Sequence, residues 1–218
     1  ALDECLLVEL NHPADNPIVL IAEGRIVSTG NFHLPLLSQR LDAASRALAW
    51  AATDCVSRIA RLMSPRFSGL PPLLSSTDTA RAGFGPLMKP AEALRAAIVY
   101  LANPVPIMPS HNADGQEDSA TFAALAAEKL GDLLVKLELL AAIELVAAAQ
   151  AVDLAKLERL APRLDHVHAA VRARSPFIDD DRPLGREIET ITAELVASGA
   201  LRELAGCSPS RKARRTST

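Results

Sequence analysis

Residues 116–160, QEDSATFAALAAEKLGDLLVKLELLAAIELVAAAQAVDLAKLERL, decide the fold. The stretch contains one glycine, Gly131, and no proline, and its leucines recur at helical spacing while alanines fill most other positions. This pattern is typical of a single long helix, because alanine and leucine are among the best helix formers. At 1.5 Å per residue such a helix would be about 60 Å long. We therefore expect an all-α protein built as a bundle around this helix. Gln116, Glu117 and Asp118 would lie at its N-terminal end, where the helix dipole favours acidic side chains.

The composition argues against several classes of protein. Of the 218 residues, 49% are hydrophobic but only 3% are aromatic, so the core is expected to consist of leucine, alanine, valine and isoleucine and to favour helices. The net charge of −3 gives no general attraction to nucleic acid or to an anionic membrane. No run of about 18 uncharged apolar residues is present to span a bilayer. The three cysteines are scattered and odd in number, which argues against a disulfide framework and for a reducing cytoplasm.

The rest of the chain alternates between turns and helical segments. A short β-hairpin is predicted from residues 18–21 and 25–27, and an irregular crossover over residues 103–115, which hold three prolines. Residues 1–206 are assigned to the helical bundle. Residues 207–218 are basic and almost free of apolar side chains, and we expect them to form a disordered tail. Further helices are predicted at residues 36–63, 90–101, 162–174 and 184–204.

Other groups of polar residues are interpreted as structural. His166 and His168 lie two residues apart, so on a helix their side chains would point about 200° apart. No cysteine or carboxylate set completes a metal site with them, and no metal is expected. Residues 179–181 (DDD) are interpreted as a solvated loop ahead of a helix. Cys55 lies among apolar residues without an activating base and is expected in the core.

Several separated segments occur in the order, and close to the spacing, of one known family. They are residues 9–11 (ELN), 15–17 (DNP), 30–33 (GNFH), 58–62 (RIARL), 68–74 (SGLPPLL), 83–84 (GF), 116–118 (QED), 142–145 (AIEL), 149–154 (AQAVDL) and 181–184 (DRPL). On these segments the chain resembles the C-terminal part of an aromatic amino-acid ammonia-lyase, most of all the histidine-type members. No single motif decides the resemblance, but the set covers nearly the whole chain, up to about residue 204.

The resemblance implies a long-helix bundle of the ammonia-lyase and fumarase type that works as a homotetramer in amino-acid metabolism. It implies non-oxidative elimination of ammonia from an aromatic or histidine-like α-amino acid to give an α,β-unsaturated acid. The family's electrophile is 4-methylidene-imidazol-5-one, formed from an internal Ala-Ser-Gly. We expect this group, the catalytic tyrosine and the carboxylate-binding arginine on a complementary N-terminal polypeptide or segment. Ala197-Ser198-Gly199 of this chain is expected to be an ordinary helix end, with Gly199 as the C-cap.

Three residues match family positions close to the substrate. Phe32 matches a phenylalanine near the prosthetic group, and Glu117 matches the glutamate of the histidine-type Gln-Glu-Asp motif. A carboxylate there suits a substrate with a ring N–H or a cation, and it can serve as an acid or a base. Gln116 would position this carboxylate or the ring. The alternative for Glu117 is a helix cap without a role in chemistry.

The chain also departs from the family pattern in the region of the pocket. Gly85 follows Gly-Phe where many members have methionine or lysine, and Ser119 stands where histidine enzymes have histidine. Residues 88–91 (MKPA) replace a Gln-Val-Thr-Ala segment, and Ala97 replaces a glutamate. These departures put histidine itself in doubt as the substrate.

Two functions therefore stay open at the level of sequence. In the first, the chain is part of a lyase, with Glu117 catalytic and with Phe32 and Gln116 binding the substrate. In the second, it is a non-catalytic helical assembly module descended from the lyases. Turnover by the assembled protein distinguishes the two.

Overall fold

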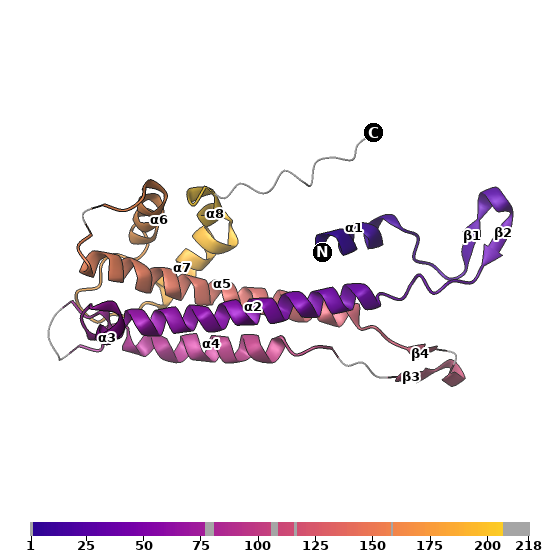
Figure 1. Cartoon of the computed structure of the whole chain (residues 1–218), viewed down its shortest axis with the longest axis horizontal. Helices are drawn as coiled ribbons and strands as arrows, with labels where there is room; N and C mark the ends of the chain where they lie inside the picture. Colours follow the sequence, from indigo (N-terminus) through magenta and orange to yellow (C-terminus); the bar gives the residue numbers. More distant parts are fainter. Residues whose placement is uncertain (1, 77–80, 106–108, 116, 158, 207–218) are drawn as a thin grey trace. The chain divides into compact units, whose positions relative to one another are not determined.

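The computed structural model describes residues 2–76, 81–105, 109–115, 117–157 and 159–206. Gln116 and the tail predicted to be disordered, residues 207–218, lie outside the described residues. The chain is mainly helical, as predicted (Figure 1). The α-helices are α1 (Leu2–Asn11), α2 (Pro35–Leu62), α3 (Pro65–Ser68), α4 (Met88–Leu101), α5 (Ala123–Leu154), α6 (Pro162–Arg172), α7 (Gly185–Ile191) and α8 (Ala200–Leu204). The strands are β1 (Ile18–Leu20), β2 (Arg25–Val27), β3 (Pro109–Asn112) and β4 (Glu117–Ser119).

The chain divides into two compact units. Unit 1 contains residues 1–51 and 96–135, and unit 2 contains residues 52–95 and 136–218. The helices α2, α4 and α5 each contribute residues to both units. Within the part of the chain that the structure describes, none of the helices combines the length and the apolar character needed to cross a bilayer.

Unit 1 is built around the first turns of α2 and α5. Its core cluster joins apolar side chains from α1, α2, α5 and the segment after α4: Leu2, Leu37, Leu41, Val105, Ala126 and Leu130. Asp42 of α2 is also buried, and its Oδ2 accepts a hydrogen bond of 3.1 Å from the backbone N–H of Val105. A buried carboxylate needs such a partner, and this bond ties the segment after α4 to α2.

The hairpin predicted near the N-terminus is confirmed. Strands β1 and β2 pair antiparallel, with Ile18 opposite Val27 and Leu20 opposite Arg25. Gly24 closes the connection with a φ of +60°, a left-handed conformation that glycine adopts without steric cost. The hairpin leads directly into the turn that carries Phe32 and then into α2.

The start of the long helix is corrected by the structure. The sequence predicted a helix from Gln116, but residues Glu117–Ser119 form β4, and α5 begins at Ala123. Strand β4 pairs antiparallel with β3, with Asn112 opposite Glu117. The pairing partner lies in the proline-containing crossover, which was expected to be irregular. The expectation that Glu117 lies at a helix start, where the dipole would keep it ionised, is therefore wrong.

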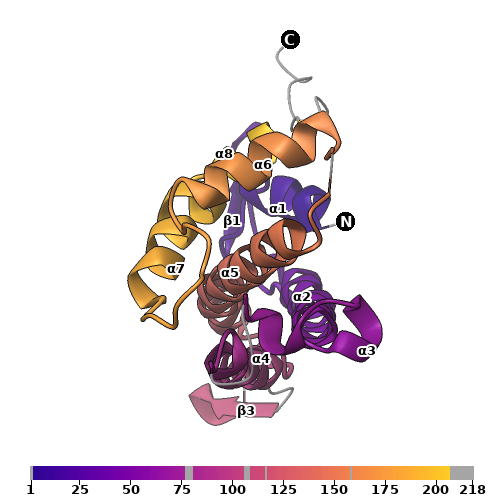
Figure 2. The same ribbon diagram turned by 90° about the vertical axis from the view of Figure 1, so that its left-hand side faces the viewer.

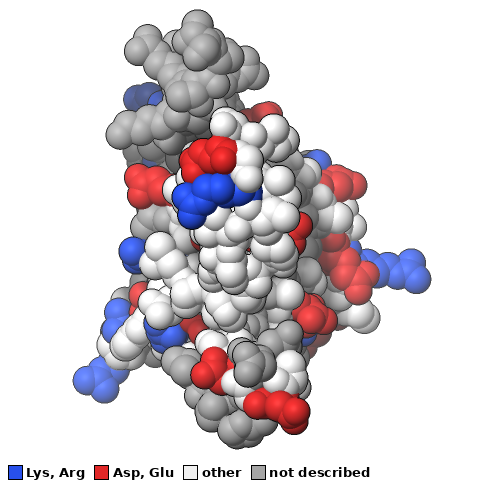
Figure 3. Space-filling model, turned by 90° about the vertical axis from the view of Figure 1, so that its right-hand side faces the viewer, with Lys and Arg blue, Asp and Glu red and all other residues white. Residues whose placement is uncertain are grey.

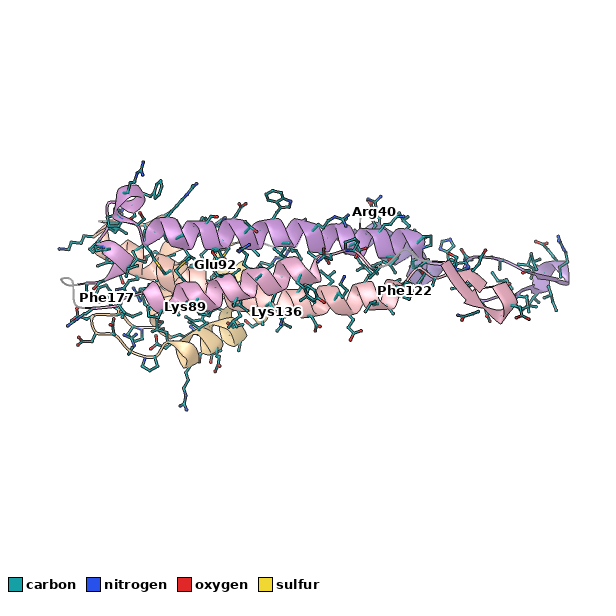
Figure 4. The ribbon with its side chains drawn as sticks, turned by 90° about the horizontal axis from the view of Figure 1, so that it is seen from below. Arg40, Lys89, Glu92, Phe122, Lys136 and Phe177 are labelled. Atoms are coloured by element: carbon teal, nitrogen blue, oxygen red, sulfur yellow. The ribbon has the colours of Figure 1, made fainter. Side chains whose placement is uncertain are left out.

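Two residues with positive φ mark the ends of α5. Phe122 (Figure 4) has a φ of +48°, and its carbonyl accepts the hydrogen bond from Ala126 N that opens the helix. At the other end Lys156 has a φ of +49°, and the helix ends at Leu154. The 32 residues of α5 span about 48 Å at 1.5 Å per residue, which is shorter than predicted at both ends.

In unit 2, α5 lies between α2 and α4 on one side and α6, α7 and α8 on the other (Figure 2). Alanines in the middle of these helices, among them Ala52, Ala142 and Ala147, are completely buried and allow close helix packing. Cys55 is in the core, as predicted, and its Sγ donates to the carbonyl oxygen of Leu140 at 3.8 Å. Burial raises the pKa of the Cys55 thiol, so this cysteine stays protonated and unreactive.

The helix predicted over residues 184–204 is interrupted. After α7, residues Thr192–Ala197 form a π-helix, and Gly199, with a φ of +81°, separates it from α8. A helical segment ends at Ala197-Ser198-Gly199, as predicted, but its C-cap is Ser198, and Gly199 is the N-cap of α8. Ser198 Oγ donates a hydrogen bond of 2.6 Å to the carbonyl oxygen of Glu194, so its hydroxyl has a partner within the same helical segment.

Gln150 holds together the elements of unit 2. Its side chain is completely buried on α5, and its Nε2 donates to the carbonyl of Ile178 at 2.8 Å. Its Oε1 accepts from Ile178 N at 3.1 Å and from Arg172 Nη2 at 3.0 Å. Arg172, from α6, also donates to Asp153 at 2.7 Å and lies over the ring of Phe177 (Figure 4). Burial lowers the pKa of Arg172, but the nearby Asp153 carboxylate opposes this effect.

Glu187 of α7 anchors the loop between α6 and α7. Its carboxylate accepts hydrogen bonds from Ser175 Oγ at 2.5 Å and from Arg182 Nε at 2.9 Å. Burial alone would raise the pKa of Glu187, but the hydrogen bonds from Arg182 and Ser175 and the charges of Arg182 and Arg172 outweigh it. The pKa of Glu187 is therefore lowered, and the ionised form stabilises the fold.

Glu187→Gln is expected to destabilise the protein at neutral pH and to matter little in acid. The folded pKa lies below the unfolded value of about 4.3, so the stabilisation is present above that pH and is lost as the pH falls through the folded pKa. Hydrogen bonds to a charged group contribute about 1.5–3 kcal/mol each. The thermal unfolding midpoint of Glu187→Gln should lie below that of the wild-type protein at pH 7, and the difference should be smaller at pH 3. Glu189→Gln, on the exposed side of the same helix, is the control. A difference that persists unchanged at pH 3 would contradict the assignment.

Candidate functional site

Two asparagines fix the turn that carries Phe32. Asn16 Oδ1 accepts hydrogen bonds from Ser28 Oγ at 3.1 Å and from Thr29 N at 2.9 Å. Asn31 Nδ2 donates to the carbonyl of Pro13 at 2.6 Å. These hydrogen bonds connect the turn before β1 to the turn after β2, at the open end of the hairpin. This gives residues 15–17 and 30–33 a common structural purpose that the sequence did not reveal.

Phe32 itself is exposed. Its relative accessibility is 45%, and its ring packs on His33 with 4.2 Å between the ring centroids and an angle of 38° between the planes. It lies three residues before the start of α2, so its backbone is anchored by the asparagine bonds on one side and by the helix on the other. An aromatic face held in this way can pack against a planar ligand or another ring.

Glu117 lies on β4, ahead of α5. The turn that joins β3 to β4 contains Ala113 and Asp114 with positive φ and Gly115 at +83°, so the backbone reverses tightly just before the Gln-Glu-Asp motif. Pairing with Asn112 and Pro109 then fixes the path of β4. Gln116, the neighbour proposed to position the carboxylate, lies outside the described residues.

Phe32 and Glu117 both belong to unit 1. Phe32 precedes α2 and Glu117 precedes α5, and the first turns of these two helices share the core cluster of unit 1. The two segments therefore enter the same packed end of a helix pair.

The Gly-Phe segment is located in unit 2 and is clamped by the acidic loop. Asp181 accepts hydrogen bonds from the backbone N–H groups of Ala82 at 2.8 Å and Gly83 at 2.9 Å. Asp180 forms an ion pair of 2.6 Å with Arg81. Residues 179–181 form an exposed loop ahead of α7, as predicted, but their carboxylates also hold Ser76 and residues 81–83, which the sequence did not indicate.

The space beside Gly85 is taken by Leu73. A Cβ placed on Gly85 would lie 3.2 Å from Leu73 Cδ1. Leu73 has a φ of +56°, which is costly for a leucine and requires support from its surroundings. That support includes the bond from Phe84 N to the carbonyl of Leu73 at 2.8 Å. Gly85, which departs from the family pattern, therefore leaves room for the Leu73 side chain that packs against it.

Among the described residues, the histidines and the surface charges suggest no further catalytic centre. His168 Nε2 lies 2.8 Å from Asp153 Oδ1 but makes no hydrogen bond, and His166 is exposed. No group of three His, Cys, Asp or Glu side chains among the described residues is arranged to hold a metal. On the face drawn in Figure 3, acidic and basic side chains are interspersed, and neither sign dominates it.

A sequence model of the aromatic amino acid lyases matches residues 1–173. The chain belongs to the aromatic amino acid lyase family. Among the lyases, the histidine ammonia-lyase of Aromatoleum aromaticum is 36% identical over 195 residues, which cover 89% of this chain and 37% of the relative. That of Anaeromyxobacter dehalogenans is 35% identical over 193 residues, covering 88% of this chain and 38% of the relative. The chain therefore spans less than two fifths of the length of these curated lyases.

Solved lyase structures share the fold. Histidine ammonia-lyase from Trypanosoma cruzi matches with a TM-score of 0.88 at 29% identity, covering 94% of this chain and 40% of that chain. Ergothionase from Treponema denticola, an ergothioneine-degrading enzyme, matches with a TM-score of 0.84 at 29% identity, covering 88% of this chain and 39% of that chain. The helical-bundle class expected from the resemblance is confirmed.

Proposed function

We propose that this chain is part of an ammonia-lyase that eliminates ammonia from an aromatic or histidine-like α-amino acid to give an α,β-unsaturated acid. The observation that carries the proposal is the family membership, together with the exposed Phe32 ring held by Asn16 and Asn31. The chain would work in the cytoplasm and in a tetrameric assembly with a complementary N-terminal lyase polypeptide or segment.

The prosthetic group would come from that complementary part. Ala197-Ser198-Gly199 is an ordinary helix end in this chain, and its serine hydroxyl is bonded to a backbone carbonyl. The exposed face of Phe32 fits a planar neighbour such as 4-methylidene-imidazol-5-one. When present, this group supplies the electrophile of the reaction. The residues of this chain would bind and orient the substrate beside it.

The roles of the three candidate residues follow from their chemistry. Phe32 would pack on the ring of the substrate or of the prosthetic group. The Glu117 carboxylate would accept a hydrogen bond from a ring N–H of the substrate or pair with a positive charge on it. As a base, it would accept a proton. Gln116 would keep that carboxylate or the ring in place. Solved relatives include histidine ammonia-lyase and tyrosine and phenylalanine aminomutases, so the family accommodates rings of different polarity.

The proposal is tested on the purified, assembled protein. Ammonia release should be measured with histidine, phenylalanine and tyrosine, and at least one of them should be turned over. A denaturing mass spectrum of the same sample should show a second polypeptide that is lighter by two waters than its sequence, as maturation of the electrophile requires. A sample that holds such a polypeptide and releases no ammonia with any of these amino acids would instead support the non-catalytic assembly module.

A further inference from the structure

We propose that two adjoining cavities between α5 and α6 form a binding site for an aromatic carboxylate. Neither Phe32 nor Glu117 lines these cavities, and both cavities lie within unit 2. The two helices that form them are visible in Figure 2. The site is thus additional to the substrate site proposed above.

The inner cavity is apolar and has a volume of about 180 Å³. Its walls come from one side of α5 and the facing side of α6, with Leu145, Ala148, Leu164, Val167 and Val171. Apolar cavities of about 150 Å³ stay dry in proteins and take up a benzene-sized molecule. The inner cavity is therefore large enough for one aromatic ring, and His168 is the one described lining residue with a polar side chain.

The outer cavity is larger and charged. It has a volume of about 570 Å³, within the range of small-molecule sites, and Lys156, Arg159 and His166 are among its lining residues. Val152, Leu160 and His168 line both cavities, so the apolar chamber and the charged cavity share a wall. A ligand with an apolar ring and a polar head could therefore occupy both.

The charges of the outer cavity favour an anionic head. The carboxylate of Asp153 is already paired, because Arg172 Nε lies 2.7 Å from its Oδ2. Asp165 stands in the first turn of α6, where the helix dipole favours an acidic side chain.

Two cations remain at the outer cavity. Among the described residues, neither Lys156 nor Arg159 has an ion-pair partner, and Asp165 is the one described carboxylate of the lining besides Asp153. A carboxylate head would gain charge-assisted hydrogen bonds from them, and an ammonium head would be repelled.

The test is a binding titration of 3-phenylpropionate against the full chain in its native assembly. Saturable binding with one site per chain is expected, and 3-phenylpropylamine, which has the same ring with a positive head, should bind at least tenfold more weakly. The double variant Lys156→Gln and Arg159→Gln should weaken binding of the acid at least tenfold, because it removes both charge-assisted hydrogen-bond donors. Ala148→Phe, which fills the inner cavity, should weaken it similarly.

Two controls separate this site from other causes of binding. Lys136→Gln removes a lysine of α5 that lines neither cavity (Figure 4), and it should change affinity less than twofold. Phe32→Ala should leave the affinity unchanged, whereas binding at the proposed substrate site would be lost. Absence of saturable binding, or affinity that is insensitive to both the double variant and Ala148→Phe, would overturn the proposal. Because Lys156 and Arg159 are exposed, the double variant stays informative even if Ala148→Phe fails to fold.

Discussion

Glu117→Ala should lower turnover by about 10²- to 10⁴-fold while the assembly stays intact, because a positioned acid or base contributes that factor. The loss should appear in kcat for ammonia release, measured on the assembled protein with its best substrate. Backbone pairing between β3 and β4 does not depend on the identity of the side chain at residue 117, so the fold of unit 1 should persist. Sedimentation velocity on the same sample checks that assembly is unchanged.

Glu128→Ala is the matched control for this experiment. It makes the same chemical change at an exposed residue of α5 in unit 1 and should leave kcat within twofold of the wild-type value. If Glu117→Ala retained full turnover, the carboxylate would have no part in the reaction. If it lost turnover together with assembly, Glu117 would be a structural residue, and the catalytic role assigned to it would be refuted.

Gln150→Leu is expected to be the most destabilising single substitution of similar size in unit 2. The leucine has nearly the same volume, but Ile178 N, the Ile178 carbonyl and Arg172 Nη2 all lose the partner that Gln150 provides. A buried group without a partner costs about 1–3 kcal/mol, so a total loss of about 3–5 kcal/mol is expected. At about 2–4 °C per kcal/mol for a chain of this size, the midpoint should fall by roughly 10 °C.

Differential scanning calorimetry of the assembled protein measures this effect. Gln39→Leu makes the same change on the exposed side of α2 and should shift the midpoint by no more than about 2 °C, as surface substitutions usually do. An unchanged midpoint for Gln150→Leu would show that water or a rearranged Arg172 replaces the lost bonds. In that case Gln150 would not be the residue that holds α5, α6 and the following loop together.

The sequence predicted those helices and strands that are determined by residues within the segment itself. The helices α2, α4 and α6 and the first hairpin were predicted to within a few residues, because apolar spacing and turn residues lie within each segment. The start of α5 was missed because it depends on pairing between residues 109–112 and 117–119, and the first of these segments has no strand-like pattern. The break in the last helix, residues 192–197, has no proline to announce it.

The candidate site shows the same limit. Phe32 and Glu117 were found through the resemblance to a family, since neither lies in a pattern that composition or spacing would single out. The bonds that hold the Phe32 turn, from Asn16 and Asn31, join residues 12 to 18 positions apart, and asparagines in turns are too common to predict them. The Asp181 clamp spans almost a hundred residues and could be seen only in the structure.

Because three helices are shared by both units, the two units cannot be separated from each other, either by recombination or by truncation. The unit boundaries fall after residues 51, 95 and 135, each in the interior of a helix, α2, α4 or α5. A cut there would leave four backbone N–H and four C=O groups without helical partners at every new pair of ends. Neither unit can therefore be excised or exchanged between genes as a module. Recombination that preserves folding would have to join at the loops between helices and carry pieces of both units together.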